Sequence, residues 1–174
     1  NAGGDDGLNF INSEFKLRNI KLENILSDGI DLDYSVGVIE DLNCTKCGND
    51  GIDMSNTTLK LTQYTSSNTG DKSISVGENS ILEAKGINID NTKIGVAVKD
   101  GSIANLKNLN ISSSEYPIAV YIKKQDFGLG NINIKNLILK NNLNPLILEE
   151  GSIFNFDNNY PIQIKKNVFT KIYP

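Results

Sequence analysis

The sequence contains no histidine and no tryptophan, and Arg18 is the only arginine among its 174 residues. Proteins bind the phosphate groups of nucleic acids mainly through lysine and arginine, whereas the formal net charge of this chain is −4. We therefore expect no general affinity for nucleic acid. Neutral or cationic partners fit this charge balance better.

Long apolar runs are also absent. No stretch approaches the 18 or more apolar residues of a membrane span, and the N-terminal NAGGDDG lacks the apolar core of a signal peptide. If the protein is exported, we expect its signal to have been removed. Charged residues make up 22% and hydrophobic residues 39%, as in ordinary globular proteins. No segment has the composition of a linker, and we predict a single domain over residues 1–174, either whole or part of a longer solenoid.

Only two cysteines occur, Cys44 and Cys47, within a CTKC segment. Three interpretations are open: a redox pair, half of a metal site, or two small buried side chains. A redox pair needs a helix N-terminus, whereas this segment lies between strand-like runs, and a zinc site needs two further Cys or His ligands. One repeat earlier the same positions hold Leu22 and Ile25, which favours packing in the core.

A strand-like segment of about six residues recurs six times at a spacing of 22, first at Asp6 and last at Tyr116. Apolar and small or polar residues alternate within each copy, which is typical of a strand with one buried face. Two columns are apolar throughout: Leu8, Ile30, Ile52, Ile74, Val96 and Ile118, and two residues later Phe10, Leu32, Met54, Val76, Val98 and Val120.

Each repeat contains further alternating runs and therefore has the strands of one full coil. Stacked coils place equivalent residues about 4.8 Å apart, so each apolar column becomes an interior ladder. The sequence thus predicts an all-β fold, a right-handed single-stranded parallel β-helix with coils of about 22 residues. A leucine-rich repeat would need a helical return segment, and no 3.6-residue apolar period is present.

The repeat has two irregular stretches. Pro117 and Pro145 occupy equivalent positions but are separated by more than one regular repeat, which predicts a loop insertion at 125–130. The last repeat follows after a shorter interval than the others, so we expect 153–174 to form a C-terminal cap. A further column, Gly7, Gly29 and Gly51, indicates a turn that needs a small residue or a positive φ.

The 22-residue coil, the strand starts DGIDLD and DGIDMS and the NINI runs resemble the pectate-lyase-like superfamily of right-handed parallel β-helices. The resemblance covers nearly the whole chain but includes no catalytic signature. It implies a secreted or surface-displayed protein, extracellular or periplasmic, of a kind that includes polysaccharide lyases, hydrolases, epimerases, tailspikes and adhesins. Fold alone does not choose among these functions.

Outward-facing columns carry the candidate chemistry. Five carboxylates fall in one patch two coils tall, and such stacked like charges need screening by solvent or a cation. Calcium suits oxygen ligands at irregular spacing, and a solvated face in which Lys72 neutralises the end of the ladder is the alternative. The predicted metal ligands are Asp28, Asp31, Asp33, Asp50 and Asp53.

Lysine and tyrosine lie at the other end of the same face. In a lyase, a metal-neutralised uronate loses its C5 proton to such a base, so Lys99 and Tyr121 are the best pair for base and acid, with Lys72 a third catalytic candidate. The predicted ligand-binding residues are Asp31, Asp53, Ser75, Lys99, Tyr121 and Lys123.

Three functions follow from these patterns. The leading interpretation is a non-catalytic module that binds polysaccharide through the acidic and lysine-bearing face. The second is a calcium-assisted polysaccharide lyase or epimerase that acts on uronate polymers. The third is a structural spacer of an adhesin or tailspike-like assembly. Unpaired strand edges at the ends of a β-helix would also allow end-to-end stacking or a larger parent chain.

Overall fold

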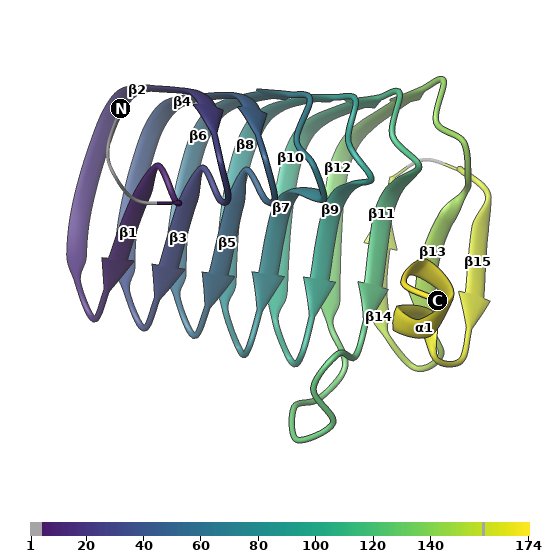
Figure 1. The fold of residues 1–174 in the computed structure, drawn as a ribbon. Coiled ribbons are helices and arrows are strands. Elements are labelled where there is room, and N and C mark those ends of the chain that lie inside the picture. The colour runs from purple at the N-terminus through teal and green to yellow at the C-terminus, as the bar shows by residue number, and fades with distance from the viewer. Residues whose placement is uncertain (1–4, 158) are drawn as a thin grey trace.

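The computed structural model describes residues 5–157 and 159–174, which form a right-handed parallel β-solenoid of about seven coils (Figure 1). One sheet has eight parallel strands: β1 (Leu8–Ile11), β3 (Ile30–Asp33), β5 (Ile52–Ser55), β7 (Lys72–Gly77), β9 (Ile94–Lys99), β11 (Tyr116–Tyr121), β13 (Leu146–Glu149) and β15 (Ile162–Lys165). The other has seven: β2 (Glu14–Ile25), β4 (Val36–Cys47), β6 (Thr58–Ser67), β8 (Ile81–Asp90), β10 (Ile103–Ser112), β12 (Asn131–Lys140) and β14 (Ile153–Phe156).

The predicted interior columns are confirmed. Ile30 pairs in register with Ile52, and Ile52 with Ile74, and all three side chains are fully buried. Such burial stabilises the fold by about 1.5–3 kcal/mol for each large aliphatic side chain. Each coil thus contributes the same inward-facing positions to one continuous core.

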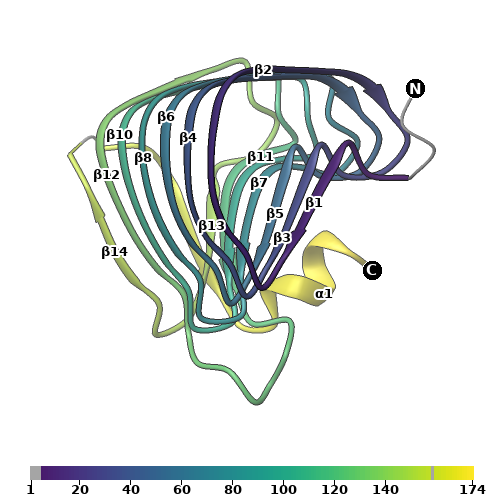
Figure 2. The ribbon, with the colours of Figure 1, turned by 90° about the vertical axis from the view of Figure 1, so that its left-hand side faces the viewer.

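The longer strands bend at a shared column of residues that adopt a left-handed conformation. Figure 2 shows the resulting seven-stranded sheet wrapping around two sides of the coil. Asparagine tolerates positive φ better than most residues, which accounts for its frequency at these corners. The bend column is Asn19, Asp41, Gln63, Gly86, Asn108 and Asn136.

Close packing explains the predicted glycine column. Gly7, Gly29 and Gly51 do not have positive φ, so that half of the expectation is wrong. A Cβ at Gly29 would lie 2.5 Å from Cys44 Sγ, and one at Gly51 would lie 2.1 Å from the Tyr64 hydroxyl oxygen. The column therefore needs small residues because the core approaches the backbone.

The two cysteines are buried in the core, as the packing interpretation requires, but they are also bonded to each other. Cys44 and Cys47 form a disulfide, and neither side chain is exposed. The pair bridges the bend at Lys46, which has a positive φ. The prediction that both side chains pack in the core is confirmed, and the disulfide is a feature that the sequence interpretation left open.

Residues after β11 depart from the regular coil. The chain between β11 and β12 leaves the solenoid as a loop that includes residues 125–130 (Figure 1). Residues 153–174 contribute β14, β15 and helix α1 (Val168–Ile172), and the helix lies on the outer face of the eight-stranded sheet. No helix within the described ranges is long and apolar enough to cross a membrane.

Candidate functional site

The outer face of the eight-stranded sheet has two unlike halves. Its N-terminal half carries Asp31, Asp33 and Asp53, which are all partly exposed. Its C-terminal half is apolar and lies beneath α1, where the helix residues Val168 and Ile172 are buried in a cluster with Ile94, Ala97, Ala119, Tyr121 and Ile147. The N-terminal half of this face is therefore open to a ligand, whereas the strands beneath α1 are covered.

Side chains at both ends hold α1 against the sheet. The Glu149 carboxylate accepts the backbone N–H groups of Asn167 at 2.6 Å and Val168 at 2.9 Å. Beyond the helix, the Tyr173 hydroxyl donates to Asp71 Oδ1 at 2.6 Å, and Lys93 Nζ lies 3.9 Å from the centroid of the Tyr173 ring. These contacts hold the helix over the C-terminal half of the sheet.

Three of the five predicted metal ligands converge on the open half. Asp28, Asp31 and Asp53 each offer a carboxylate oxygen, and these oxygens lie within 4.8 Å of one another; we call them the acidic cluster. Burial, followed by the charges of Asp33 and the other carboxylates, raises the pKa of Asp31 to about 6. Burial also raises the pKa of Asp28. A cation would relieve this repulsion.

Two polar side chains border the acidic cluster. Asn9 Nδ2 donates to Asp31 Oδ2 at 2.8 Å. Lys99 Nζ lies 3.8 Å from Asp53 Oδ1, and its side chain passes over Gly77, where a Cβ would lie 2.7 Å from Lys99 Cε. Lys99 thus neutralises part of the charge of Asp53, and no lysine lies comparably close to Asp31 in the described ranges.

The other two predicted metal ligands lie outside the acidic cluster. Asp50 is 1% exposed, and its carboxylate oxygens lie 3.1 and 3.3 Å from Lys72 Nζ, as the alternative interpretation expected. Asp33 is partly exposed beside the cluster and contributes to the raised pKa of Asp31.

The aspartate column also has a structural role that the sequence interpretation missed. Oδ1 of Asp6, Asp28 and Asp50 accepts the backbone N–H of the residue one coil further on, at 3.1, 2.7 and 2.9 Å. Backbone groups that leave the sheet need such partners. The signal was present, because these aspartates recur once per repeat, directly before the glycine column.

The acidic cluster fits a hard divalent cation. Calcium takes six to eight oxygen ligands at irregular geometry, whereas magnesium demands a near-ideal octahedron. The three carboxylates would supply part of this set, and water would complete it. Asp28 Oδ1 already accepts hydrogen bonds from Asn49 Nδ2 and the Asp50 backbone, so its second oxygen is the better placed of the two for a cation.

The structure brings the predicted catalytic pair together but covers it. Tyr121 pairs in register with Lys99, and their exposed fractions are 0% and 6%. Burial raises the pKa of the Tyr121 phenol. Burial lowers the pKa of Lys72, but Asp50 and Asp71 outweigh this effect and raise it, so Lys72 is protonated at neutral pH.

The remaining predicted ligand-binding residues have different surroundings. Ser75 is fully buried, whereas Lys123 is exposed and its backbone N–H donates to Asp100 Oδ1 at 2.7 Å. The sequence interpretation placed Ser75, Lys99 and Tyr121 on an open face, whereas all three are buried, and Tyr121 is covered by α1, which it did not foresee. The four-residue spacing of Val168 and Ile172 is the available signal for that helix.

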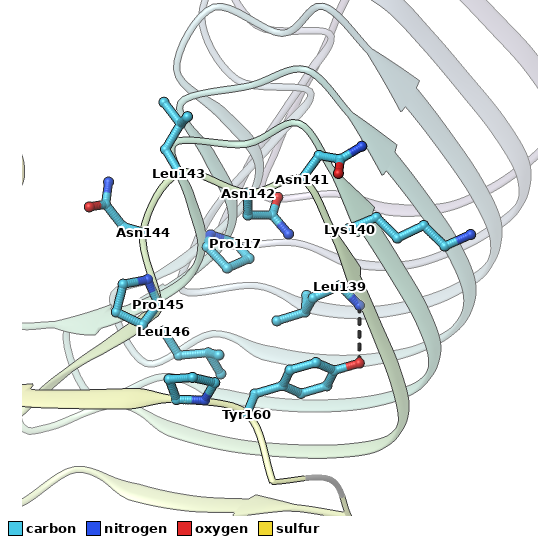
Figure 3. Close-up of a pocket in the computed structure, with 11 residues that line it drawn as sticks. Pro117, Leu139, Lys140, Asn141, Asn142, Leu143, Asn144, Pro145, Leu146 and Tyr160 are labelled. Carbon is cyan, nitrogen blue, oxygen red and sulfur yellow. Dashed lines mark hydrogen bonds between the residues drawn. The ribbon is translucent and has the colours of Figure 1, made fainter.

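An open hollow of about 410 Å³ lies along the segment that joins β12 to β13 (Figure 3). The Tyr160 hydroxyl accepts the Leu139 backbone N–H at 3.2 Å and donates to the Leu137 carbonyl at 3.2 Å. None of the site residues predicted from the sequence lines this hollow, whose walls are Pro117, Leu139, Lys140, Asn141, Asn142, Leu143, Asn144, Pro145, Leu146, Tyr160 and Pro161.

Comparisons with known proteins assign this chain to no family. No protein-family model matches the chain, and searches of curated proteins and of solved structures find no significant match. The fold and the cluster together define a parallel β-solenoid with an acidic surface site. The architecture expected from the pectate-lyase-like resemblance is present, while nothing here indicates that superfamily specifically.

Proposed function

We propose that this β-solenoid is a non-catalytic module that binds polysaccharide through the open half of the eight-stranded sheet, with calcium at the acidic cluster. The observation that carries the proposal is the convergence of Asp28, Asp31 and Asp53 on an accessible face. Calcium there would bridge the protein to carboxylate or hydroxyl groups of a glycan. A relation to pectate-lyase-like proteins would fit this role and rests on architecture alone.

Burial of the candidate acid and base supports the non-catalytic form of the proposal. A general base must come within hydrogen-bond reach of the proton that it removes. Tyr121 is fully buried beneath α1, and Lys99 is 6% exposed with its ammonium directed toward Asp53. A lyase or epimerase that used this pair would need α1 to move away first.

The disulfide supports a location outside the cytoplasm. Disulfides persist in oxidising compartments and are rare in reducing ones. Cys44 and Cys47 are bonded within the core of the solenoid. We therefore propose an extracellular, surface or periplasmic location, which agrees with display of a glycan-binding face.

Calcium binding can be measured directly by titration calorimetry. We expect one site per chain, and we expect Asp31→Asn to weaken it at least about tenfold because a central carboxylate is lost. Asp126→Asn, at an exposed loop position, is the matched control and should bind as the wild type does. A wild-type protein that takes up no calcium at neutral pH contradicts the metal proposal.

The calcium affinity measured in this titration should depend on pH. The pKa of Asp31 is raised to about 6 in the folded protein, so its protonated form favours folding. Its contribution to stability is present at about pH 4 and is lost as the pH rises through about 6. Calcium should therefore bind more weakly at about pH 5 than at pH 7, because protons compete for the ligand.

Glycan binding tests the function itself. On an array of neutral and uronate-containing polysaccharides, we expect binding that calcium strengthens, and we expect EDTA and Asp31→Asn both to remove this calcium-dependent increase, with Asp126→Asn again as control. Unsaturated products, followed by ultraviolet absorbance, would instead indicate a lyase. A chain that binds no glycan with or without calcium would be a structural spacer.

A further inference from the structure

The outer face of the seven-stranded sheet carries a column of lysines. Lys107 pairs in register with Lys85 on one side and Lys135 on the other. All three side chains are exposed. Neighbouring strands lie about 4.8 Å apart, so this lysine column presents one positive charge per coil along the solenoid axis.

The charge of the lysine column is not compensated on this face. Within the described ranges, no carboxylate lies within 4.0 Å of the ammonium groups of Lys85, Lys107 or Lys135. The N-terminal coils of the same face differ, because Glu40 there pairs with Lys16 at 3.2 Å and Arg18 at 2.9 Å. Like charges stacked across strands are unfavourable, so an anionic ligand would stabilise the lysine column.

Two residues before the lysines, β10 and β12 carry the amides Asn105 and Asn133, and β8 carries Glu83. Asn133 Nδ2 donates to Asn105 Oδ1 at 2.9 Å, and Asn105 Nδ2 donates to Glu83 Oε1 at 2.6 Å. These bonds hold the amides in a row. Asn105 retains a second N–H, because an amide nitrogen carries two donors and only one is used here.

An apolar column lies two residues earlier again. Ile81 is 39% exposed, Ile103 is partly exposed, and Ile153 is 63% exposed, with Asn131 between the last two. On the central strand β10, the face therefore presents an apolar, an amide and a cationic side chain in order, at Ile103, Asn105 and Lys107. An acidic sugar offers the matching groups: a carboxylate or sulfate, hydroxyls, and a ring face of C–H groups.

The surface is also hollowed at this point. A depression of about 220 Å³ lies over β6, β8 and β10, and its walls include Lys60, Glu83, Lys85, Asn105 and Lys107. Charged and amide side chains thus surround a space that could take part of a sugar residue. The lysine column continues beyond it to Lys135 on β12.

The same features disfavour nucleic acid as the ligand. Single strands are bound by stacking on aromatic side chains, whereas these three columns of β8, β10 and β12 contain no aromatic residue. The only arginine of the chain, Arg18, lies on β2 and pairs with Glu40.

We propose that the outer face of β8, β10 and β12 binds a linear anionic polysaccharide that runs along the solenoid axis, with about one acidic group per sugar facing each lysine. This proposal goes beyond the function proposed for the acidic cluster, because it places a second polysaccharide site on the other sheet. It needs no calcium.

Binding of polygalacturonate in EDTA tests the proposal, with dextran as the neutral polymer. We expect the wild type to bind polygalacturonate more weakly as salt is raised, and to ignore dextran. The triple variant Lys85→Gln, Lys107→Gln and Lys135→Gln should lose at least about tenfold in affinity. A control triple, Lys21→Gln, Lys165→Gln and Lys166→Gln, changes the net charge equally at exposed positions of other surfaces and should bind normally.

Several outcomes overturn the proposal. They are an equal loss in both triple variants, no binding by the wild type in EDTA, and tighter binding to single-stranded DNA or to anionic vesicles than to polygalacturonate. Thermal unfolding of both triples checks that they fold. Failure of this proposal can be distinguished from failure of the calcium proposal at the acidic cluster, because Asp31→Asn should leave polygalacturonate binding in EDTA unchanged.

Discussion

Replacement of Lys72 by methionine is expected to lower the free energy of unfolding by about 3–5 kcal/mol above pH 7, because it leaves a buried carboxylate without its cation. Asp50 is 1% exposed, and Lys72 Nζ lies 3.1 Å from its Oδ1. Lys72 also lies 2.5 Å from Asp71 Oδ2, but Asp71 is partly exposed and keeps its hydrogen bond from Tyr173. Denaturant unfolding measures the difference.

The pH dependence of the unfolding free energy of Lys72→Met distinguishes the loss of a charge from the loss of packing. Burial raises the pKa of Asp50 to about 7, so the neutral acid favours the folded state and stability falls as the pH rises through that value. The deficit of Lys72→Met should therefore shrink at about pH 5. The double variant with Asp50→Asn should recover most of the loss at all pH values, whereas a deficit that persists in the double variant would point to lost packing.

Substitution of Gly51 by alanine is expected to cost about 1–3 kcal/mol of unfolding free energy through overpacking. The new Cβ would lie 2.1 Å from the Tyr64 hydroxyl oxygen and 2.6 Å from the Ser73 carbonyl oxygen. Because Tyr64 is fully buried and donates to that carbonyl at 3.0 Å, neither group can move away freely. Thermal and denaturant unfolding would both report the loss.

Two further variants define the cause of the Gly51 effect. Gly128→Ala adds the same methyl group in a loop, where nothing lies within 4 Å, and should change stability by less than about 0.5 kcal/mol. Gly51→Ala combined with Tyr64→Phe removes the nearer of the two clashes and should be less destabilised than the sum of the single variants. Strict additivity would argue against the contact.

The fold could be predicted from the sequence because its main determinant is periodic. A side chain such as Ile52 meets its equivalents one repeat away in either direction, so a linear pattern specifies the three-dimensional neighbours directly. The same logic correctly placed Asp31 beside Asp53 and Lys99 beside Tyr121. Local register and burial of the interior columns therefore follow from spacing alone.

The covered half of the site could not be predicted in that way. Helix α1 has no equivalent in earlier coils, and its contacts join Val168 to residues such as Tyr121 that are far away in the chain. The lysine column was missed for a different reason. Lys85 and Lys107 are one regular repeat apart, but Lys135 follows only after the longer coil, which hides the alignment from a search at constant spacing.

The phenol of Tyr160 protects part of the edge of β12. An exposed strand edge offers unpaired backbone groups to any other extended chain and so promotes aggregation. The Tyr160 hydroxyl occupies the Leu139 N–H and bonds to the Leu137 carbonyl, so a single side chain takes positions that an incoming strand would need. Although the last coil is short, this stretch of β12 is therefore protected from pairing with a strand of another molecule.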